Sequence, residues 1–127
     1  MRKYLDDIGV TERPDTWNSG DARQDDWADE RKLYGFDERE TWSLDFTFYL
    51  WLYERLVAYK EICCCDLSYH TWDYNGKAYT QEELIDMMLE RLRFSFSDEY
   101  NDWNDQQWTY VHEIEKIWAL ILPAMWW

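Results

Sequence analysis

The stretch TWSLDFTFYLWLYERLVAYKEICCC, residues 41–65, decides the fold. Apolar side chains recur along it at the three- and four-residue spacing of an α-helix, and one stripe runs through Leu44, Phe48, Trp51, Arg55 and Tyr59. Thr41 or Ser43 can cap its start, and Asp45 falls in the first turn, where the helix dipole favours a negative charge. Because residues 44–53 are apolar almost all round, we expect a central helix that packs on several sides.

A β-strand over residues 46–53 is the alternative, since aromatic residues also favour strands. The helix is favoured because the apolar pattern continues past Glu54 and Arg55 to Ile62. The same eight residues are the longest strongly apolar run in the chain, and a membrane span needs about 20.

Local signals downstream predict a hairpin and two further helices. Asn75-Gly76 is a strong signal for a tight turn between residues 71–74 and 77–80. Thr80 and Glu83 have the spacing of a capping box, which predicts a helix from there to about Phe96. A last helix is expected over residues 104–122, where an apolar stripe at helical spacing runs up to Pro123.

The composition indicates one folded domain. The chain has 127 residues, of which 46% are hydrophobic and 20% aromatic, too much apolar surface for a disordered chain. We expect residues 1–36 to form a polar N-terminal arm with short helices near 2–8 and 24–33, the second ended by Gly35. The predicted fold is an all-α bundle, in which residues 37–127 form a helical domain of three principal helices with a candidate short β-hairpin at 72–79.

The charge balance excludes several kinds of partner. Acidic residues number 27 against 13 Lys and Arg, which gives a formal net charge of −14. Such a chain repels phosphates, so we expect no direct binding to nucleic acid and none to anionic membranes. The acidic surface either keeps an aromatic-rich protein soluble or complements a basic surface, including one that normally holds nucleic acid. No apolar leader follows Met1, so we expect a cytoplasmic protein.

Three cysteines stand together at positions 63–65. An odd number does not suit a disulfide framework, and adjacent cysteines rarely bridge each other. We expect reduced thiols at a helix end, some of them buried as small apolar groups. A metal site shared with His70 is the alternative, although three successive helical positions fan out and do not converge on one ion. No cofactor is predicted.

The candidate binding surface lies between Phe94 and Glu115, where no Lys or Arg occurs. Three aspartates there have i, i+4, i+7 spacing and would line one face of a helix. Tryptophans lie among the acids, and the candidate partner-binding residues are Asp98, Glu99, Asp102, Trp103, Asp105 and Trp108. One alternative is that these acids only favour a helix N-terminus through its dipole. Another is a divalent-cation site, but no EF-hand ligand pattern is present.

No motif for catalysis is present. The sequence has no Gly-rich phosphate loop and no Gly-x-Ser-x-Gly elbow, and His112-Glu113 has no second His at the spacing of a zinc protease. We therefore expect no catalytic residues and a protein that is not an enzyme. The ten Trp, ten Tyr and five Phe exceed what a core of this size takes, so some should be exposed at a partner interface or a homodimer seam.

The run Glu40-Thr41-Trp42-Ser43-Leu44-Asp45-Phe46-Thr47, followed by Arg55-Leu56 and Lys60-Glu61, resembles a motif in small uncharacterised proteins that bacteriophages and prophages encode. The similar part covers about residues 40–96. The resemblance implies a phage accessory protein in the host cytosol, and such proteins often neutralise host defences by stoichiometric binding. It also implies structural roles for Glu40, Trp42, Asp45 and Arg55, with Asp45 pairing with Arg55 across the bundle and Trp42 anchoring the helix start.

These observations lead to one hypothesis of function and two alternatives. The first is a non-enzymatic, anti-CRISPR-like inhibitor, whose acidic face mimics nucleic acid and docks in the basic groove of a host nucleic-acid-processing defence protein. The second is an aromatic-pocket sponge for an immune nucleotide signal, with Arg55, Arg91 or Arg93 beside stacking aromatics. The third is a self-assembling structural phage protein.

Overall fold

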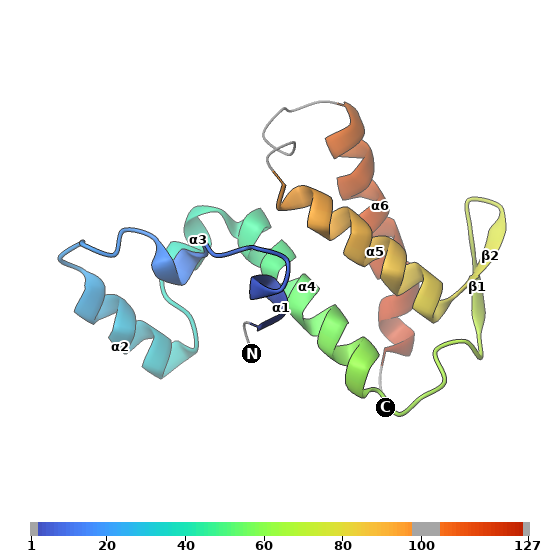
Figure 1. The fold of residues 1–127 in the computed structure, drawn as a ribbon, viewed down its shortest axis with the longest axis horizontal. Coiled ribbons are helices and arrows are strands. Elements are labelled where there is room, and N and C mark those ends of the chain that lie inside the picture. The colour runs from blue at the N-terminus through green and yellow to red at the C-terminus, as the bar shows by residue number, and fades with distance from the viewer. Residues whose placement is uncertain (1–2, 98–104, 126–127) are drawn as a thin grey trace. The chain divides into compact units, whose positions relative to one another are not determined.

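The structure, a computed structural model, describes residues 3–97 and 105–125, with the side chains of 105–107 left aside. The protein is mostly helical, at 65%, with one small antiparallel sheet, which confirms the expected helical character (Figure 1). In chain order the described elements are α1 (Lys3–Asp6), η1 (Pro14–Thr16), α2 (Gln24–Tyr34), α3 (Arg39–Trp42), α4 (Leu44–Ile62), β1 (Thr71–Tyr74), β2 (Lys77–Thr80), α5 (Gln81–Ser95), α6 (Asp105–Ile121) and η3 (Leu122–Ala124).

The three longest described helices, α4, α5 and α6, occupy the three segments that the periodicity predicted. The description as three principal helices is too simple, because α2 adds a further helix of 11 residues and α1 and α3 add single turns. The predicted stop of α2 is confirmed, since Gly35 follows it in the left-handed conformation with φ of 85°.

The contacts divide the chain into two compact units, Met1–Glu54 and Arg55–Trp127. The sequence placed its boundary at residue 36, whereas the boundary between these units falls inside α4. The N-terminal unit therefore includes not only the polar arm but also α3 and the first half of α4.

Helix α4 begins directly after Ser43, one of the two expected capping positions. Ser43 separates it from α3, because the backbone there (φ −141°, ψ 79°) leaves the helical region. The stripe through Leu44, Phe48 and Trp51 faces outward, since these side chains are 65%, 39% and 43% exposed. The buried positions are Tyr49, Leu50, Leu52, Tyr53, Glu54 and Leu56. A segment that is apolar all round gives no period from which its buried face could be read.

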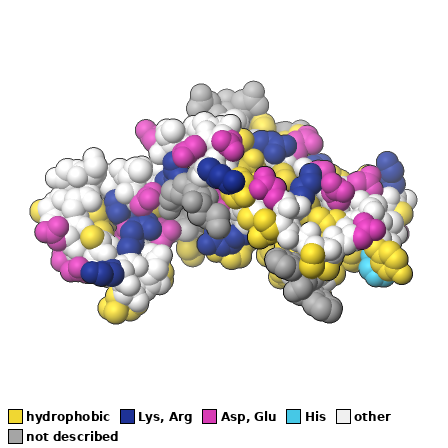
Figure 2. All heavy atoms as spheres, turned by 60° about the horizontal axis from the view of Figure 1, so that its bottom comes forward, with side chains coloured by type: hydrophobic (Ala, Val, Ile, Leu, Met, Phe, Trp, Pro, Cys, Tyr) yellow, Lys and Arg dark blue, Asp and Glu magenta, His cyan; other side chains and the backbone are white. Residues whose placement is uncertain are grey.

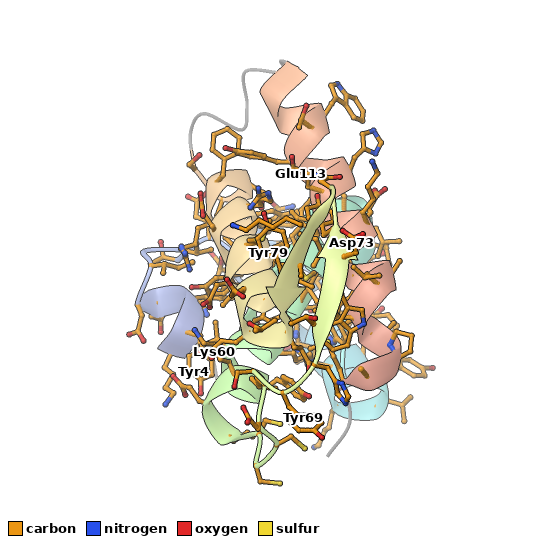
Figure 3. The ribbon with its side chains drawn as sticks, turned by 90° about the vertical axis from the view of Figure 1, so that its right-hand side faces the viewer. Tyr4, Lys60, Tyr69, Asp73, Tyr79 and Glu113 are labelled. Carbon is orange, nitrogen blue, oxygen red and sulfur yellow. The ribbon has the colours of Figure 1, made fainter. Side chains whose placement is uncertain are left out.

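The C-terminal unit is built by local signals that the structure confirms. Asn75 and Gly76 turn between β1 and β2 with positive φ, and Tyr74 pairs with Lys77 in the register. Thr80 caps α5 by accepting a hydrogen bond from the Glu83 amide, and Glu83 bonds back to the Thr80 amide. Figure 3 shows the hairpin, which carries Asp73 and Tyr79, beside α5 and α6.

Helices α5 and α6 pack against each other through apolar faces. The fully buried side chains on this pair are aliphatic: Leu84, Ile85, Met88 and Leu92 on α5, and Ile114, Ile117 and Ile121 on α6. The opposite face of α6 is therefore turned outward, and it includes Trp108, His112 and Glu115.

In the N-terminal unit the central polar group is the Asp37 carboxylate, whose side chain is 0% exposed. It accepts hydrogen bonds from Arg39 Nε at 3.0 Å and Nη2 at 2.8 Å, and one from Arg31 Nε at 2.5 Å. The Arg39 guanidinium lies 4.4 Å from the Trp27 ring centroid and donates to the Trp17 carbonyl at 2.8 Å. One buried carboxylate thus joins α2, α3 and the turn after η1.

The arginines determine the charge state of Asp37. Burial alone would raise the pKa of its carboxyl, but the hydrogen bonds from Arg39 and Arg31 outweigh burial and hold the pKa below its ordinary value. The stabilising contribution of this carboxylate is therefore complete above the ordinary Asp pKa of about 4, and it is lost as the pH falls through the lower, folded-state pKa.

Replacing Asp37 by asparagine should lower the free energy of unfolding by about 3 kcal/mol at pH 7, because it removes the anion of the buried Arg39 guanidinium and one of the two carboxylates that pair with Arg31. Urea denaturation followed by circular dichroism measures this change. Asp21→Asn is the matched control, since Asp21 pairs with Arg23 at the surface, and it should change the midpoint little. The difference between Asp37→Asn and wild type should shrink below pH 4, and a constant difference down to pH 2 would contradict the assigned role.

Candidate functional site

The predicted binding residues lie at the start of α6 and in the segment before it. Asp98, Glu99, Asp102 and Trp103 fall outside the described residues. Asp105 is the first residue of α6, and its side chain is likewise outside the description. Trp108, one turn further on, is 52% exposed. The structure therefore describes the C-terminal end of the predicted surface.

An outward row on α6 continues from Trp108 toward the C-terminus. The Trp108 and His112 rings stack with 6.3 Å between their centroids and 27° between their planes. His112 Nδ1 lies 3.6 Å from a Glu115 carboxylate oxygen, and both side chains are exposed. The spacing of 108, 112 and 115 is i, i+4, i+7, which places the three on one helical face. Asp105 precedes Trp108 by three residues in the sequence.

Glu113, the other described acid of this part of α6, is neutralised by Arg91 from α5. Glu113 accepts a hydrogen bond from Arg91 Nε, and Arg91 also donates to the Met87 carbonyl at 3.0 Å. The Arg91 guanidinium lies 5.4 Å from the Tyr110 ring centroid. Arg91 is therefore engaged by α6, which leaves Arg55 and Arg93 as the other arginines named for the nucleotide-sponge alternative.

Of the 21 acidic residues outside residues 94–115, seven form a described ion pair with Arg or Lys. The described ion pairs between Arg or Lys and a carboxylate are Arg13–Asp6, Arg23–Asp21, Arg23–Glu38, Arg31–Asp37, Arg31–Glu40, Arg39–Asp37, Lys60–Glu82, Lys60–Asp86 and Arg91–Glu113. Figure 2 shows the outcome on one face, where carboxylates and cationic side chains lie next to each other. Such paired charges attract a distant basic partner weakly, because their fields cancel.

A second acidic group that we did not predict lies on α2. Asp25, Asp26 and Asp29 are exposed, and no ion pair to them is found within the described ranges. Asp25 and Asp26 occupy the first turn of the helix, where its dipole stabilises them without any partner. The sequence shows this group only as a cluster of aspartates, and their place at the start of a helix is sufficient to explain them. We therefore use this group below as a control.

The residues of the phage-like motif serve the fold at several points. The Glu40 carbonyl accepts a hydrogen bond from the Thr47 hydroxyl at 2.7 Å, which joins α3 to α4. Trp42 meets Trp27 edge-on, with ring centroids 5.8 Å apart, although it stays 45% exposed. Asp45 accepts a hydrogen bond from the Ser43 hydroxyl at 2.9 Å. Pairing of Asp45 with Arg55 is wrong, because both lie on α4 and ten helical residues separate them by about 15 Å.

Metal binding and membrane insertion find no support in the described part of the chain. Among residues 3–97 and 105–125, no three His, Cys, Asp or Glu side chains are arranged to hold a metal ion. None of the helices described there is both long enough and apolar enough to cross a bilayer. Comparison with protein-family models, curated proteins and solved structures gave no match.

Proposed function

We propose that the protein is a non-enzymatic inhibitor that covers the basic groove of a nucleic-acid-binding protein with an acidic face formed by residues 98–115. The observation that carries this proposal is the separation of charge along the chain. Cations are absent from residue 94 to residue 115, a stretch that carries six acidic residues. We call residues 98–115 the acidic face.

In the sequence, the acidic face combines six acids with no Lys or Arg. Its acids are Asp98, Glu99, Asp102, Asp105, Glu113 and Glu115. Arg91 neutralises Glu113, and His112 Nδ1 lies 3.6 Å from a Glu115 carboxylate oxygen. A groove that binds nucleic acid presents Lys and Arg at the spacing of phosphates, so an array of carboxylates can take the place of the phosphate backbone. Complementary charge also accelerates encounter and disfavours acidic competitors.

Trp108 gives the acidic face an anchor that charge alone lacks. It is half exposed on a rigid helix, and stacking on His112 holds its ring in place. Tryptophan is enriched at interface hot spots because one ring buries a large area with little loss of side-chain entropy. The combination of an aromatic anchor with surrounding carboxylates supports a protein interface over a surface that merely keeps the chain soluble.

The biological class of the partner rests on the resemblance of residues 40–96 to phage-encoded proteins. In that setting the basic partner is a host defence protein that processes nucleic acid, and the inhibitor acts stoichiometrically in the host cytosol. Affinity capture from a bacterial lysate, followed by mass spectrometry, tests this class directly. Enrichment of a nucleic-acid-binding protein that duplex DNA or RNA elutes supports the proposal, and enrichment that neither nucleic acid affects contradicts it.

Reversing three charges on the acidic face should abolish binding of the captured partner. The triple variant Asp98→Lys, Asp102→Lys, Asp105→Lys places cations against a basic groove, and we expect affinity to fall at least about 100-fold. Surface plasmon resonance at fixed salt measures it. The matched control is the triple Asp25, Asp26 and Asp29 to Lys, which changes the net charge equally on α2. Equal losses in both variants would show that net charge matters and that the acidic face does not.

Removing the Trp108 ring should weaken the same complex. A hot-spot tryptophan contributes about 2 kcal/mol or more, so Trp108→Ala should raise Kd roughly 30-fold. Tyr69→Ala is the control, because Tyr69 is 76% exposed and lies on the connection before β1, away from the acidic face. Isothermal titration calorimetry measures both variants. A Kd for Trp108→Ala within threefold of wild type would remove the anchor from the proposal.

Self-association is a second candidate, which the outward side of α4 favours. Phe48 and Trp51 stack there with ring centroids 6.1 Å apart, and Leu44 lies one turn before them. All three are exposed, and an apolar row of this kind commonly marks an interface. Sedimentation equilibrium at increasing protein concentration distinguishes the two candidates. An average mass that rises above the 15.8 kDa of the monomer favours assembly, and a mass that stays at the monomer value rejects it.

A further inference from the structure

The three cysteines gather where α4 ends. The Cys63 amide still donates to the Tyr59 carbonyl at 2.9 Å, as the last backbone bond of the helix. The chain then folds back, and the Cys65 amide donates to the Cys63 sulfur at 3.4 Å. Cys63 is half-buried, while Cys64 and Cys65 are exposed. The turn therefore brings residue 65 back over the sulfur of residue 63.

The side chains around this turn are consistent with close sulfur atoms. Loss of hydration, followed by hydrogen bonding to the Cys63 thiol, raises the pKa of Cys65. Burial, together with a hydrogen bond to the same Cys63 thiol, raises the pKa of the Tyr59 hydroxyl to about 12. Cys63 therefore sits between a neutral phenol and a second thiol.

We propose that Cys63 and Cys65 form a redox-active dithiol that exchanges with small-molecule disulfides such as oxidised glutathione and closes to an intramolecular disulfide. Cys64 is excluded by geometry, because the Cα atoms of adjacent residues are about 3.8 Å apart, below the range of about 4.4–6.8 Å that disulfides adopt. Residues two apart in a turn reach that range. A metal role for the thiols has no support, since no metal-binding group is found among the described residues.

The exchange proceeds in two balanced steps. One cysteine, as its thiolate, attacks a sulfur of oxidised glutathione; a protein–glutathione disulfide forms and one glutathione thiolate leaves. The second cysteine thiolate then attacks the protein sulfur of that mixed disulfide and expels the second glutathione. The protein dithiol is oxidised, the glutathione disulfide is reduced, and the two thiol protons end on the two glutathione molecules.

The small size of the loop determines the stability of this disulfide. A loop closed over one intervening residue restricts the unfolded chain little, so the crosslink gains little entropic stabilisation. Exposed and strained disulfides are reduced readily. The pair therefore stays reduced in a reducing cytosol and closes when the ratio of oxidised to reduced glutathione rises.

Thiol counting on the full chain after equilibration with glutathione mixtures tests the proposal. Wild type should fall from three free thiols to one as the mixture becomes oxidising, with a mass lower by two hydrogen atoms and no retained glutathione. Cys64→Ser should close in the same way and end with no free thiol. Cys63→Ser and Cys65→Ser should each form no internal disulfide and retain glutathione as a mixed disulfide.

Two outcomes overturn the assignment. One is closure in Cys63→Ser or Cys65→Ser, which would make Cys64 a partner. The other is a wild-type chain that only retains glutathione or only forms crosslinked dimers under oxidising conditions. Circular dichroism of the three serine variants checks that each is folded, and because these side chains lie at the surface or close to it, we expect unchanged spectra.

Discussion

The shortage of cationic side chains governs how this protein is built. With 13 Lys and Arg against 27 acids, each cation that enters the fold leaves carboxylates elsewhere without a partner. Arg31 and Arg39 converge on the buried Asp37, and Arg91 binds Glu113 between α5 and α6. These arginines are necessary because a buried carboxylate without a cation or hydrogen bonds is strongly destabilising. Residues 94–115 contain no Lys or Arg, so the six acids there have no cation within their own segment.

Where local chemistry determines the backbone, the sequence was sufficient to predict the fold. Asn75-Gly76 sets the hairpin turn, the Thr80 and Glu83 pair starts α5, and Gly35 ends α2, because each effect involves only residues close along the chain. The burial of α4 could not be predicted, since a uniformly apolar segment has no distinct face. The buried Asp37–Arg39 pair was not predicted, because charged residues two positions apart in a sequence are usually exposed to solvent and seldom form part of a core.

The candidate surface was predictable only in part. The absence of cations from 94 to 115 follows from the sequence, which also offered Trp108 as a binding residue, whereas the 52% exposure of Trp108 comes from the structure. The pairing of acids elsewhere depends on tertiary contacts such as Lys60 with Asp86, 26 positions apart, which no local pattern reveals. What distinguishes the acidic face from the general negative charge of the chain is the absence of Lys and Arg from residues 94–115. The stacking of His112 on Trp108 likewise depends on side-chain conformations on α6 that the sequence does not specify.

The central claim is that the acidic face occupies the site where a partner holds nucleic acid. The most direct measurement is the binding of an oligonucleotide to the captured partner, repeated at increasing fixed concentrations of this protein. If both ligands compete for one groove, the apparent Kd of the oligonucleotide rises in proportion to the concentration of the protein and does not level off. A Kd that stays constant, or that reaches a plateau because both ligands bind at once, would contradict the account.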